Sequence, residues 1–111
     1  MNRLIGVVHL GPLPGSPGFD GDFPACLAAA SSDARLLAEA GFDALVVENF
    51  GDAPFYADQV PAVTVAAMTR AVAEIAEAAP LPIGVNVLRN DARSALSIAA
   101  ATGAAFIRVN V

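Results

Sequence analysis

The sequence contains no lysine, and this absence limits the partners that the protein can bind. Six arginines stand against eleven acidic residues, so the formal net charge at pH 7 is -5. Surfaces that bind nucleic acid normally carry an excess of Lys and Arg that neutralises backbone phosphates. The charge balance therefore argues against nucleic acid as a partner.

Cysteine is almost absent as well, because Cys26 is the sole one in the sequence. A lone cysteine cannot form an intramolecular disulfide, and no Cys and His residues recur at the spacing of a zinc site. We interpret Cys26 as a small buried residue at the start of a helix rather than as a nucleophile. The sequence predicts no metal site and identifies no cofactor.

Long hydrophobic runs are missing too, although 56% of the residues are hydrophobic and the mean hydropathy is +0.59. Charges or prolines interrupt every stretch before it reaches the roughly 20 apolar residues that cross a bilayer. The short apolar run after Arg3 leads into prolines instead of the cleavage site of a signal peptide. We therefore expect a soluble, cytoplasmic protein with a packed core.

Four short apolar runs alternate with three helical patterns. The runs at residues 4–9, 44–48, 83–88 and 105–110 predict strands, and their continuous apolar character indicates burial on both faces. Helices are expected at residues 25–40, from a Thr64 cap to Pro80, and from an Asn90 or Asp91 cap to Gly103. The order βαβαβαβ predicts a parallel sheet, which belongs either to an open doubly wound fold or to part of a barrel.

Polar side chains follow the predicted strands at their carboxyl ends, where ligands bind in both parallel architectures. Side chains two residues apart share one face of a strand. By this rule one face carries the candidate catalytic residues, which are His9, Glu48, Asn86, Arg108 and Asn110. If that face points inward, a titratable base, a carboxylate, amides and a cation converge on a cavity suited to a small polar ligand.

Each of these side chains also has a structural interpretation. Glu48 has the stronger functional case, because a carboxylate that ends an apolar strand is costly to bury without a partner, ligand or metal. Arg108 is an alternative, purely neutralising partner for Glu48, and His9 fits hydrogen bonding within the mouth of a barrel equally well. Asn86 and Asn110 equally fit hydrogen bonding to backbone groups. His9 and Glu48 alone do not identify a metal.

Two long connections, at residues 11–24 and 49–61, follow the first two predicted strands. The first is rich in Pro and Gly and predicts a shaped active-site loop, but it lacks the Gly-Lys-Ser/Thr element of a phosphate-binding P-loop. Together the connections hold five aromatic residues, which are Phe19, Phe23, Phe50, Phe55 and Tyr56. Loop packing, a pocket wall, a lid and an interaction surface all remain open for these rings.

Several segments resemble those of the BtpA/SgcQ family. They are IGVVHLGPLPGSP at residues 5–17, VVENFGDAPF at 46–55, TVAAMT at 64–69, GVNVLRND at 84–91 and FIRVNV at 106–111. The resemblance covers essentially the whole chain and implies a parallel (β/α)₈ barrel of the TIM type, related to ribulose-phosphate-binding barrels. Residues 1–111 are then expected to form an N-terminal partial barrel domain that stops at the fourth strand. The resemblance also implies a set of ligand-binding candidates near the catalytic face: Asn49, Asp52, Arg89 and Asn90.

The resemblance implies no agreed reaction, and three hypotheses follow from it. In the first, the complete barrel binds a small polar or phosphorylated metabolite and carries out lyase, isomerase or hydrolase chemistry. The second follows from a family branch linked to photosystem I biogenesis: the protein assembles a membrane complex without catalysis and associates peripherally with the membrane. In the third, the chain is an inactive truncated fragment that self-associates through its open half barrel. The phosphate site that usually follows strands seven and eight is missing, which argues against phosphosugar binding by this chain alone.

Overall fold

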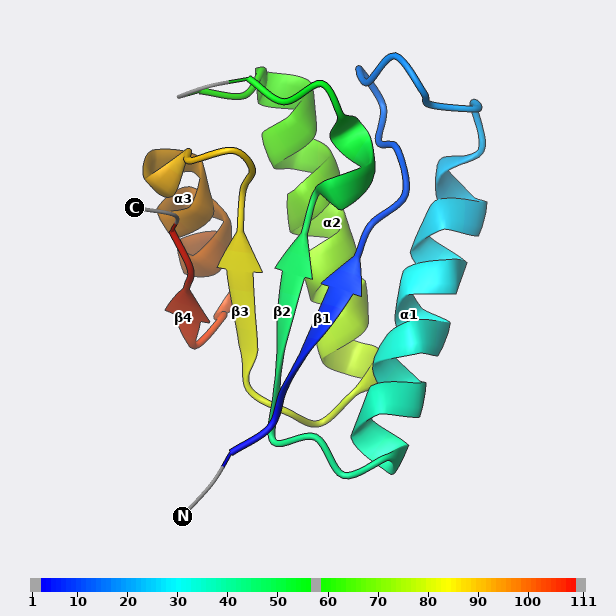
Figure 1. Ribbon diagram of the computed structural model, residues 1–111, viewed down its shortest axis with the longest axis vertical. Coiled ribbons are helices and arrows are strands. Elements are labelled where there is room, and N and C mark those ends of the chain that lie inside the picture. The colour runs from blue at the N-terminus through cyan, green and yellow to red at the C-terminus, as the bar shows by residue number, and fades with distance from the viewer. Residues whose placement is uncertain (1–2, 57–58, 110–111) are drawn as a thin grey trace.

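The computed structural model describes residues 3–56 and 59–109 and contains one parallel sheet of four strands (Figure 1). The strands β1 (Ile5–His9), β2 (Ala44–Glu48), β3 (Ile83–Asn86) and β4 (Phe106–Ile107) lie side by side in chain order. The helices α1 (Phe23–Glu39), α2 (Ala62–Ala78) and α3 (Ala92–Thr102) connect them, and the short 3₁₀ helix η1 (Phe50–Asp52) follows β2. The predicted alternation of parallel strands and helices is confirmed.

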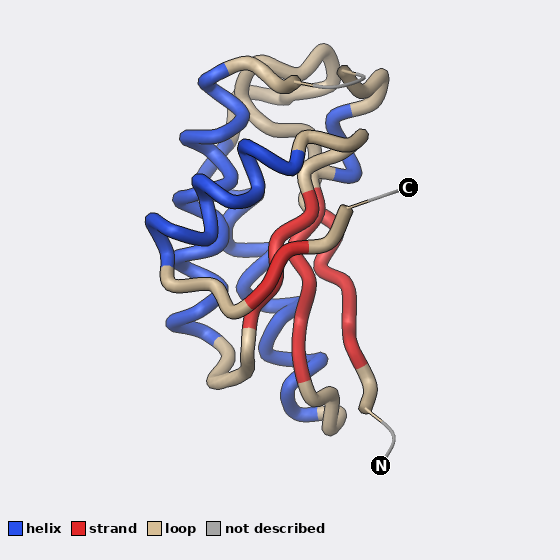
Figure 2. Tube along the Cα trace, turned by 90° about the vertical axis from the view of Figure 1, so that its left-hand side faces the viewer, coloured by secondary structure: helices blue, strands red, loops and turns tan. Residues whose placement is uncertain are grey.

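All three helices lie on one face of this sheet, as Figure 2 shows. A doubly wound sheet reverses its strand order at one point and carries helices on both faces. Consecutive parallel strands with their helices on a single side are instead typical of a (β/α)₈ barrel, in which the helices form an outer ring. The architecture is therefore that of part of a TIM-type barrel, a choice that sequence periodicity left open.

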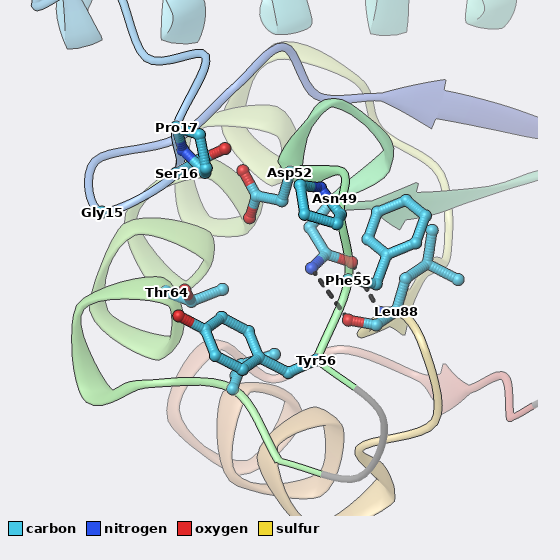
Figure 3. A pocket seen from close by; sticks show the side chains of 11 residues that line it. Gly15, Ser16, Pro17, Asn49, Asp52, Phe55, Tyr56, Thr64 and Leu88 are labelled. Atoms are coloured by element: carbon cyan, nitrogen blue, oxygen red, sulfur yellow. Dashed lines mark hydrogen bonds between the residues drawn. The ribbon is translucent and has the colours of Figure 1, made fainter.

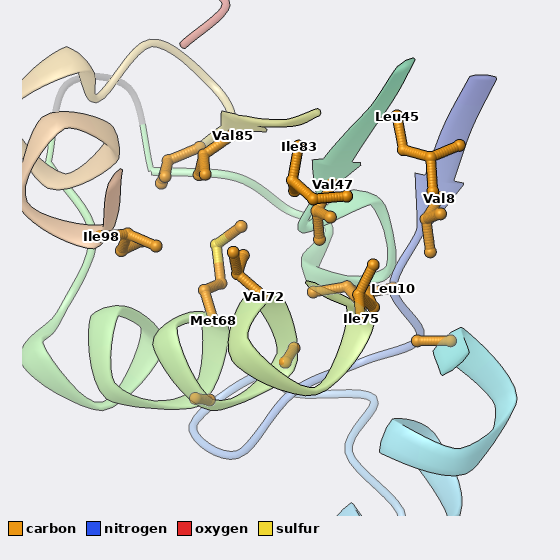
Figure 4. Packing of buried hydrophobic residues seen from close by; sticks show 14 of the residues in the cluster. Val8, Leu10, Leu45, Val47, Met68, Val72, Ile75, Ile83, Val85 and Ile98 are labelled. Atoms are coloured by element: carbon orange, nitrogen blue, oxygen red, sulfur yellow. The ribbon is translucent and has the colours of Figure 1, made fainter. Parts of the chain in front are cut away.

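The hydrophobic core fills the space between the sheet and the helices (Figure 4). Its strand side chains include Val8, Leu45, Val47, Ile83 and Val85, and its helix side chains include Met68, Val72, Ile75 and Ile98. Burying side chains of this size contributes about 1.5–3 kcal/mol each. Met68, Val72 and Ile75 lie on the buried face of α2 and pack this helix against the sheet.

The opposite face of the sheet has no helix over it in the described part of the chain (Figure 2). Ile5 on β1 is 53% exposed, whereas Val46 on β2 is 3% exposed. With Phe106 and Arg108 they line a shallow open groove. Burial on both faces is thus confirmed for β2 and β3 and wrong for the edge strands β1 and β4. β1 is covered only on its helix side, and both residues of β4 are only partly buried.

The first helix begins two residues earlier than predicted. The Asp22 side chain accepts a hydrogen bond from the Ala25 N–H, and Pro24 occupies the first turn, where its missing N–H costs nothing. The predicted end is confirmed, because Gly41 adopts a φ of +96° just after the last turn. Because Asp22 is the N-cap, Phe23 and Pro24 belong to the helix and not to the preceding loop, where they were predicted.

The other two helices show one wrong cap and one confirmed cap. α2 begins directly after Pro61, which occupies the N-cap position, so the predicted Thr64 cap is wrong and Thr64 lies buried in the first turn. α3 begins after Asp91, whose side chain accepts a hydrogen bond from the Ser94 N–H. It ends at Gly103 in the left-handed conformation. The Pro61 carbonyl accepts a hydrogen bond from the Thr64 N–H at 3.0 Å, so the first turn of α2 begins before the predicted cap.

The last two strands are shorter than predicted. β3 ends at Asn86 because the Asn49 side chain takes up both backbone groups of Leu88, the last residue of the predicted strand. β4 comprises only Phe106–Ile107, and Asn110, a predicted site residue, lies outside the described residues. β3 therefore ends at Asn86 and β4 ends just before Arg108, two of the predicted catalytic residues.

Candidate functional site

A polar cluster at the carboxyl end of the sheet centres on Glu48, the last residue of β2. The strand register pairs Glu48 with His9 on β1 and with Asn86 on β3. Asn86 Nδ2 donates a hydrogen bond to Glu48 Oε2 at 2.8 Å, and Arg108 Nη1 lies 3.4 Å from the same oxygen. His9 Nε2 lies 3.4 Å from Glu48 Oε1. Four of the five predicted catalytic residues therefore come together, as strand parity predicts.

Burial within the cluster is uneven. The Glu48 side chain is 9% exposed, while those of His9 and Arg108 are 52% and 54% exposed. A shielded carboxylate needs opposite charge and hydrogen bonds, and Arg108 and Asn86 supply them. The neutralising interpretation of Arg108 thus has direct geometric support, but the exposed sides of the guanidinium and imidazole also remain accessible to a ligand.

Asn86 is incompletely paired within the cluster. The residue is 1% exposed, and its Oδ1 has no hydrogen-bond partner among the described residues. Leaving such an acceptor buried and unpaired costs about 1–3 kcal/mol. The polar network around Glu48 is therefore not saturated by the side chains present in residues 3–56 and 59–109.

The imidazole of His9 is held from a second direction by Phe50 in η1. The two rings stack with their centroids 4.4 Å apart and their planes 21° from parallel. Stacking restricts rotation of the imidazole, so Phe50 helps to aim His9 Nε2 at Glu48. The sequence left several uses open for Phe50 and did not pair it with His9, although its position two residues after Glu48 was an available signal.

The predicted ligand-binding residues lie on two different loops. Asn49 is 1% exposed and joins the loops after β2 and β3: it accepts a 2.6 Å hydrogen bond from the Leu88 N–H and donates a 3.2 Å bond to the Leu88 carbonyl. Arg89 and Asn90 are exposed in the loop after β3. Asn49 thus links the two loops through its hydrogen bonds to Leu88. Ligand binding by Asn49, Arg89 and Asn90 stays a prediction.

Asp52, the remaining ligand-binding candidate, lines a cavity of about 270 Å³ between the loops (Figure 3). Other residues around this cavity are Ser16, Asn49, Phe55, Tyr56 and Thr64. Asp52 Oδ1 accepts a hydrogen bond from the Leu13 N–H at 2.9 Å. Burial raises the pKa of the Asp52 carboxyl, although the Leu13 hydrogen bond and the nearby polar side chains of Asn49 and Ser16 act to lower it. Of the uses considered for the loop aromatics, Phe55 and Tyr56 thus form a pocket wall.

Gly51 holds the first two loops together. Its N–H donates a hydrogen bond to the Leu10 carbonyl at 2.9 Å. A Cβ at this position would lie 2.5 Å from backbone atoms of Gly11 and Pro12, which is closer than any side chain tolerates. Gly51 therefore sets the separation of the loops that border both the Glu48 cluster and the cavity, a role that no sequence pattern revealed.

Cys26 lies in the first turn of α1, as predicted. It is only partly buried, whereas the sequence predicted a buried residue. Burial raises the pKa of its thiol, and the carboxylates of Asp20 and Asp52 add to the effect. A higher pKa lowers the fraction of reactive thiolate. The environment therefore suits a structural thiol better than a nucleophile.

A search of the described residues, which omit 57–58 and both chain ends, gives no group of three or more His, Cys, Asp or Glu side chains placed to hold a metal ion. The same part of the chain contains no helix that is long and apolar enough to span a membrane.

The fold and the polar cluster at its strand ends define an α/β domain of the TIM-barrel type. Its particular family follows from sequence comparison: the sequence model of the BtpA family matches residues 1–111, so the chain belongs to that family. The resemblance found in the sequence motifs is thereby confirmed.

Individual relatives match this chain over only part of their own length. The photosystem I biogenesis protein BtpA of Synechocystis is 50% identical over 110 residues, which are 99% of this chain and 38% of that protein. An uncharacterized protein of Thermococcus kodakarensis is 56% identical over 110 residues, or 97% of this chain and 41% of the relative. The putative sgc region protein SgcQ of Escherichia coli is 36% identical over 107 residues, or 95% and 39%. The chain spans about two fifths of the length of these relatives.

Proposed function

We propose that the protein, in its full natural length, binds a small polar or phosphorylated metabolite at the carboxyl end of the sheet. The observation that carries this proposal is the arrangement around Glu48, where a shielded carboxylate lies between two half-exposed groups, His9 and Arg108. A guanidinium is suited to a carboxylate or phosphate group of a ligand, because its planar donors match both geometries. The site therefore offers one anchor for negative charge and one group for proton transfer.

Within this site His9 is the group that would give or take a proton. One side of its imidazole is accessible, and Nε2 contacts Glu48 on the other. A carboxylate in this position orients the ring and stabilises the imidazolium that forms when the ring takes up a proton. Asn86 in turn holds Glu48 in place through its 2.8 Å hydrogen bond. Such acid–base chemistry serves lyase, isomerase and hydrolase reactions alike.

The proposal is tested by calorimetric titration of the full-length protein with triose, pentose and hexose phosphates and with the same sugars without phosphate. The longer chain is used because one face of the sheet has no helix over it in the described residues (Figure 2). Saturable binding of at least one compound is expected, weakened about tenfold or more by Arg108→Gln, since a charge-assisted hydrogen bond contributes about 1.5–3 kcal/mol. Arg35→Gln removes the same charge from an exposed position on α1 and should leave binding unchanged.

Two outcomes contradict the metabolite proposal. One is the absence of saturable binding across the whole panel. The other is undiminished binding by the Glu48→Gln variant, provided that this variant melts cooperatively, because the proposed site is built around that carboxylate. A variant that binds normally would place the ligand elsewhere on the protein.

A second candidate function is assembly of a membrane complex without catalysis. It is favoured by the 50% identity to a relative named for photosystem I biogenesis. Such a protein would fractionate with membranes and co-purify with subunits of the complex when expressed in a photosynthetic host. If Glu48→Gln abolishes metabolite binding but leaves co-purification intact, the two functions are separate; if no subunit co-purifies, the assembly candidate is refuted.

A further inference from the structure

The cavity between the loops is separate from the Glu48 cluster. Glu48 and Asn49 are neighbours at the end of β2, and successive side chains of a strand point to opposite faces. Glu48 contacts Arg108 at the groove on the uncovered face, whereas Asn49 lines the cavity together with Thr64 of α2, on the helix side. The backbone after β2 therefore divides two sites.

Charge in this cavity has one sign. Among the described residues that line it, Asp52 is the single charged side chain, and none of these residues is Arg, Lys or His. Its Oδ1 is engaged by the Leu13 N–H, a neutral donor. A partly buried carboxylate without an opposite charge is costly, and the raised pKa of Asp52 reflects that cost. The lining is thus electrostatically suited to a positively charged occupant.

Hydroxyl groups surround the remaining space in this cavity. The Ser16 hydroxyl is near enough to lower the pKa of Asp52, yet its buried Oγ makes no hydrogen bond of regular geometry. Tyr56 and Thr64, which also carry hydroxyls, line the same cavity as Asp52 (Figure 3). Hydroxyl oxygens accept hydrogen bonds, so the lining contains acceptors besides the Asp52 carboxylate.

The walls of the cavity are mainly apolar and include two aromatic rings. Phe55 and Tyr56 lie on its border together with Val60 and Leu88 (Figure 3). Aromatic faces attract cations, and alkyl walls accommodate an apolar body. A volume of about 270 Å³ lies just below the usual range of ligand pockets, so the occupant must be small.

We propose that this cavity binds a small organic ammonium ion, with Asp52 and the surrounding hydroxyls accepting its N–H donors and Phe55 and Tyr56 enclosing its apolar part. An ammonium group has three donors and no acceptor, which matches a lining that offers a carboxylate and hydroxyl oxygens. An anionic ligand is disfavoured because it would face the Asp52 carboxylate, and no described lining residue supplies a compensating positive charge.

Three probes of the same shape and different charge test this inference: benzylammonium, benzyl alcohol and benzoate. Each is titrated calorimetrically into the full-length protein. Benzylammonium is expected to bind saturably and about tenfold more tightly than benzyl alcohol, because the charge roughly doubles the strength of each hydrogen bond. Benzoate is expected not to bind. Equal affinity for the alcohol and the ammonium ion, or binding of benzoate, overturns the proposal.

Three variants locate the binding, and one of them is a control. Asp52→Asn keeps an acceptor for the Leu13 N–H but removes the charge, and it should lower the ammonium-to-alcohol preference to about one. Asp33→Asn, on the exposed side of α1, removes the same charge and should retain the tenfold preference. Tyr56→Leu removes an exposed ring and should weaken benzylammonium about two- to fivefold, as expected for a cation–π contact. If Asp52→Asn does not fold, unchanged affinity in Tyr56→Leu still refutes the site.

Discussion

Replacing Asp91 by Ala tests how the loops at the carboxyl end of the sheet are held. Asp91 is 4% exposed and lies at the N-cap of α3. Its carboxylate accepts hydrogen bonds from the Ser94 N–H at 2.9 Å, the Ser94 hydroxyl at 2.6 Å and the Val60 N–H at 2.8 Å. Asp91 therefore caps one helix and fixes the segment that leads into another.

The expected cost of Asp91→Ala follows from these contacts. Loss of an N-cap side chain costs about 1 kcal/mol. Leaving the buried Val60 N–H without an acceptor costs about 1–3 kcal/mol more. The free energy of unfolding should thus fall by roughly 2–4 kcal/mol. Asp91→Asn retains a good capping group and should lose about half as much.

Urea denaturation of the full-length variants, followed by circular dichroism, measures these differences. The wild type and Asp91→Asn should also respond differently to acid. Burial acts to raise the pKa of Asp91, but hydrogen bonds from Ser94 and Val60, together with the nearby Arg93, hold it below its usual range. A depressed pKa in the folded state means that the charge stabilises at neutral pH. That contribution is lost as the pH falls below about 4 and through the folded-state pKa.

The advantage of the wild type over Asp91→Asn should therefore shrink as the pH falls through that range. A loss of less than about 0.5 kcal/mol in Asp91→Ala, the level of an ordinary surface change, would refute the reasoning. An advantage over Asp91→Asn that does not change on acidification would refute the assignment of the depressed pKa.

Three further predictions concern packing and reactivity. Gly51→Ala should lower the free energy of unfolding by about 1–3 kcal/mol in the same denaturation assay, because the added Cβ would meet the backbone of Pro12. An unchanged free energy of unfolding would contradict the close loop contact. Leu45→Ala should lower the free energy of unfolding by about 2–5 kcal/mol, because Leu45 is fully buried. Leu36 is 62% exposed, so Leu36→Ala should lower it by less than about 0.5 kcal/mol. Similar losses in the two variants would contradict the assigned core. Cys26 should react more slowly with iodoacetamide in the native protein than in urea at mildly alkaline pH, and equal rates would argue against its raised pKa.

The alternation of elements and the grouping of strand-end side chains could be predicted from the sequence because both depend on regular periods. Parity along a strand brings every second side chain to one face, and parallel register then places His9, Glu48 and Asn86 in a row. The contacts of Glu48 with its neighbours follow from this geometry. The functional roles of these residues do not, since parity says nothing about a ligand.

The loop contacts could not be predicted because no local pattern specifies them. Asn49 and Leu88 are 39 residues apart in the sequence, as are Asp52 and Leu13. Such pairs form only when the sheet has brought neighbouring loops together. The Thr64 error has a more local cause: the prediction rested on a capping residue type alone, whereas the helix begins directly after Pro61.

The short helix η1 connects the two candidate sites within three residues. Phe50 at its first position stacks on His9, and Asp52 at its last position borders the cavity. A substitution that changes the backbone of η1 is therefore expected to alter both the orientation of the His9 ring and the lining of the cavity.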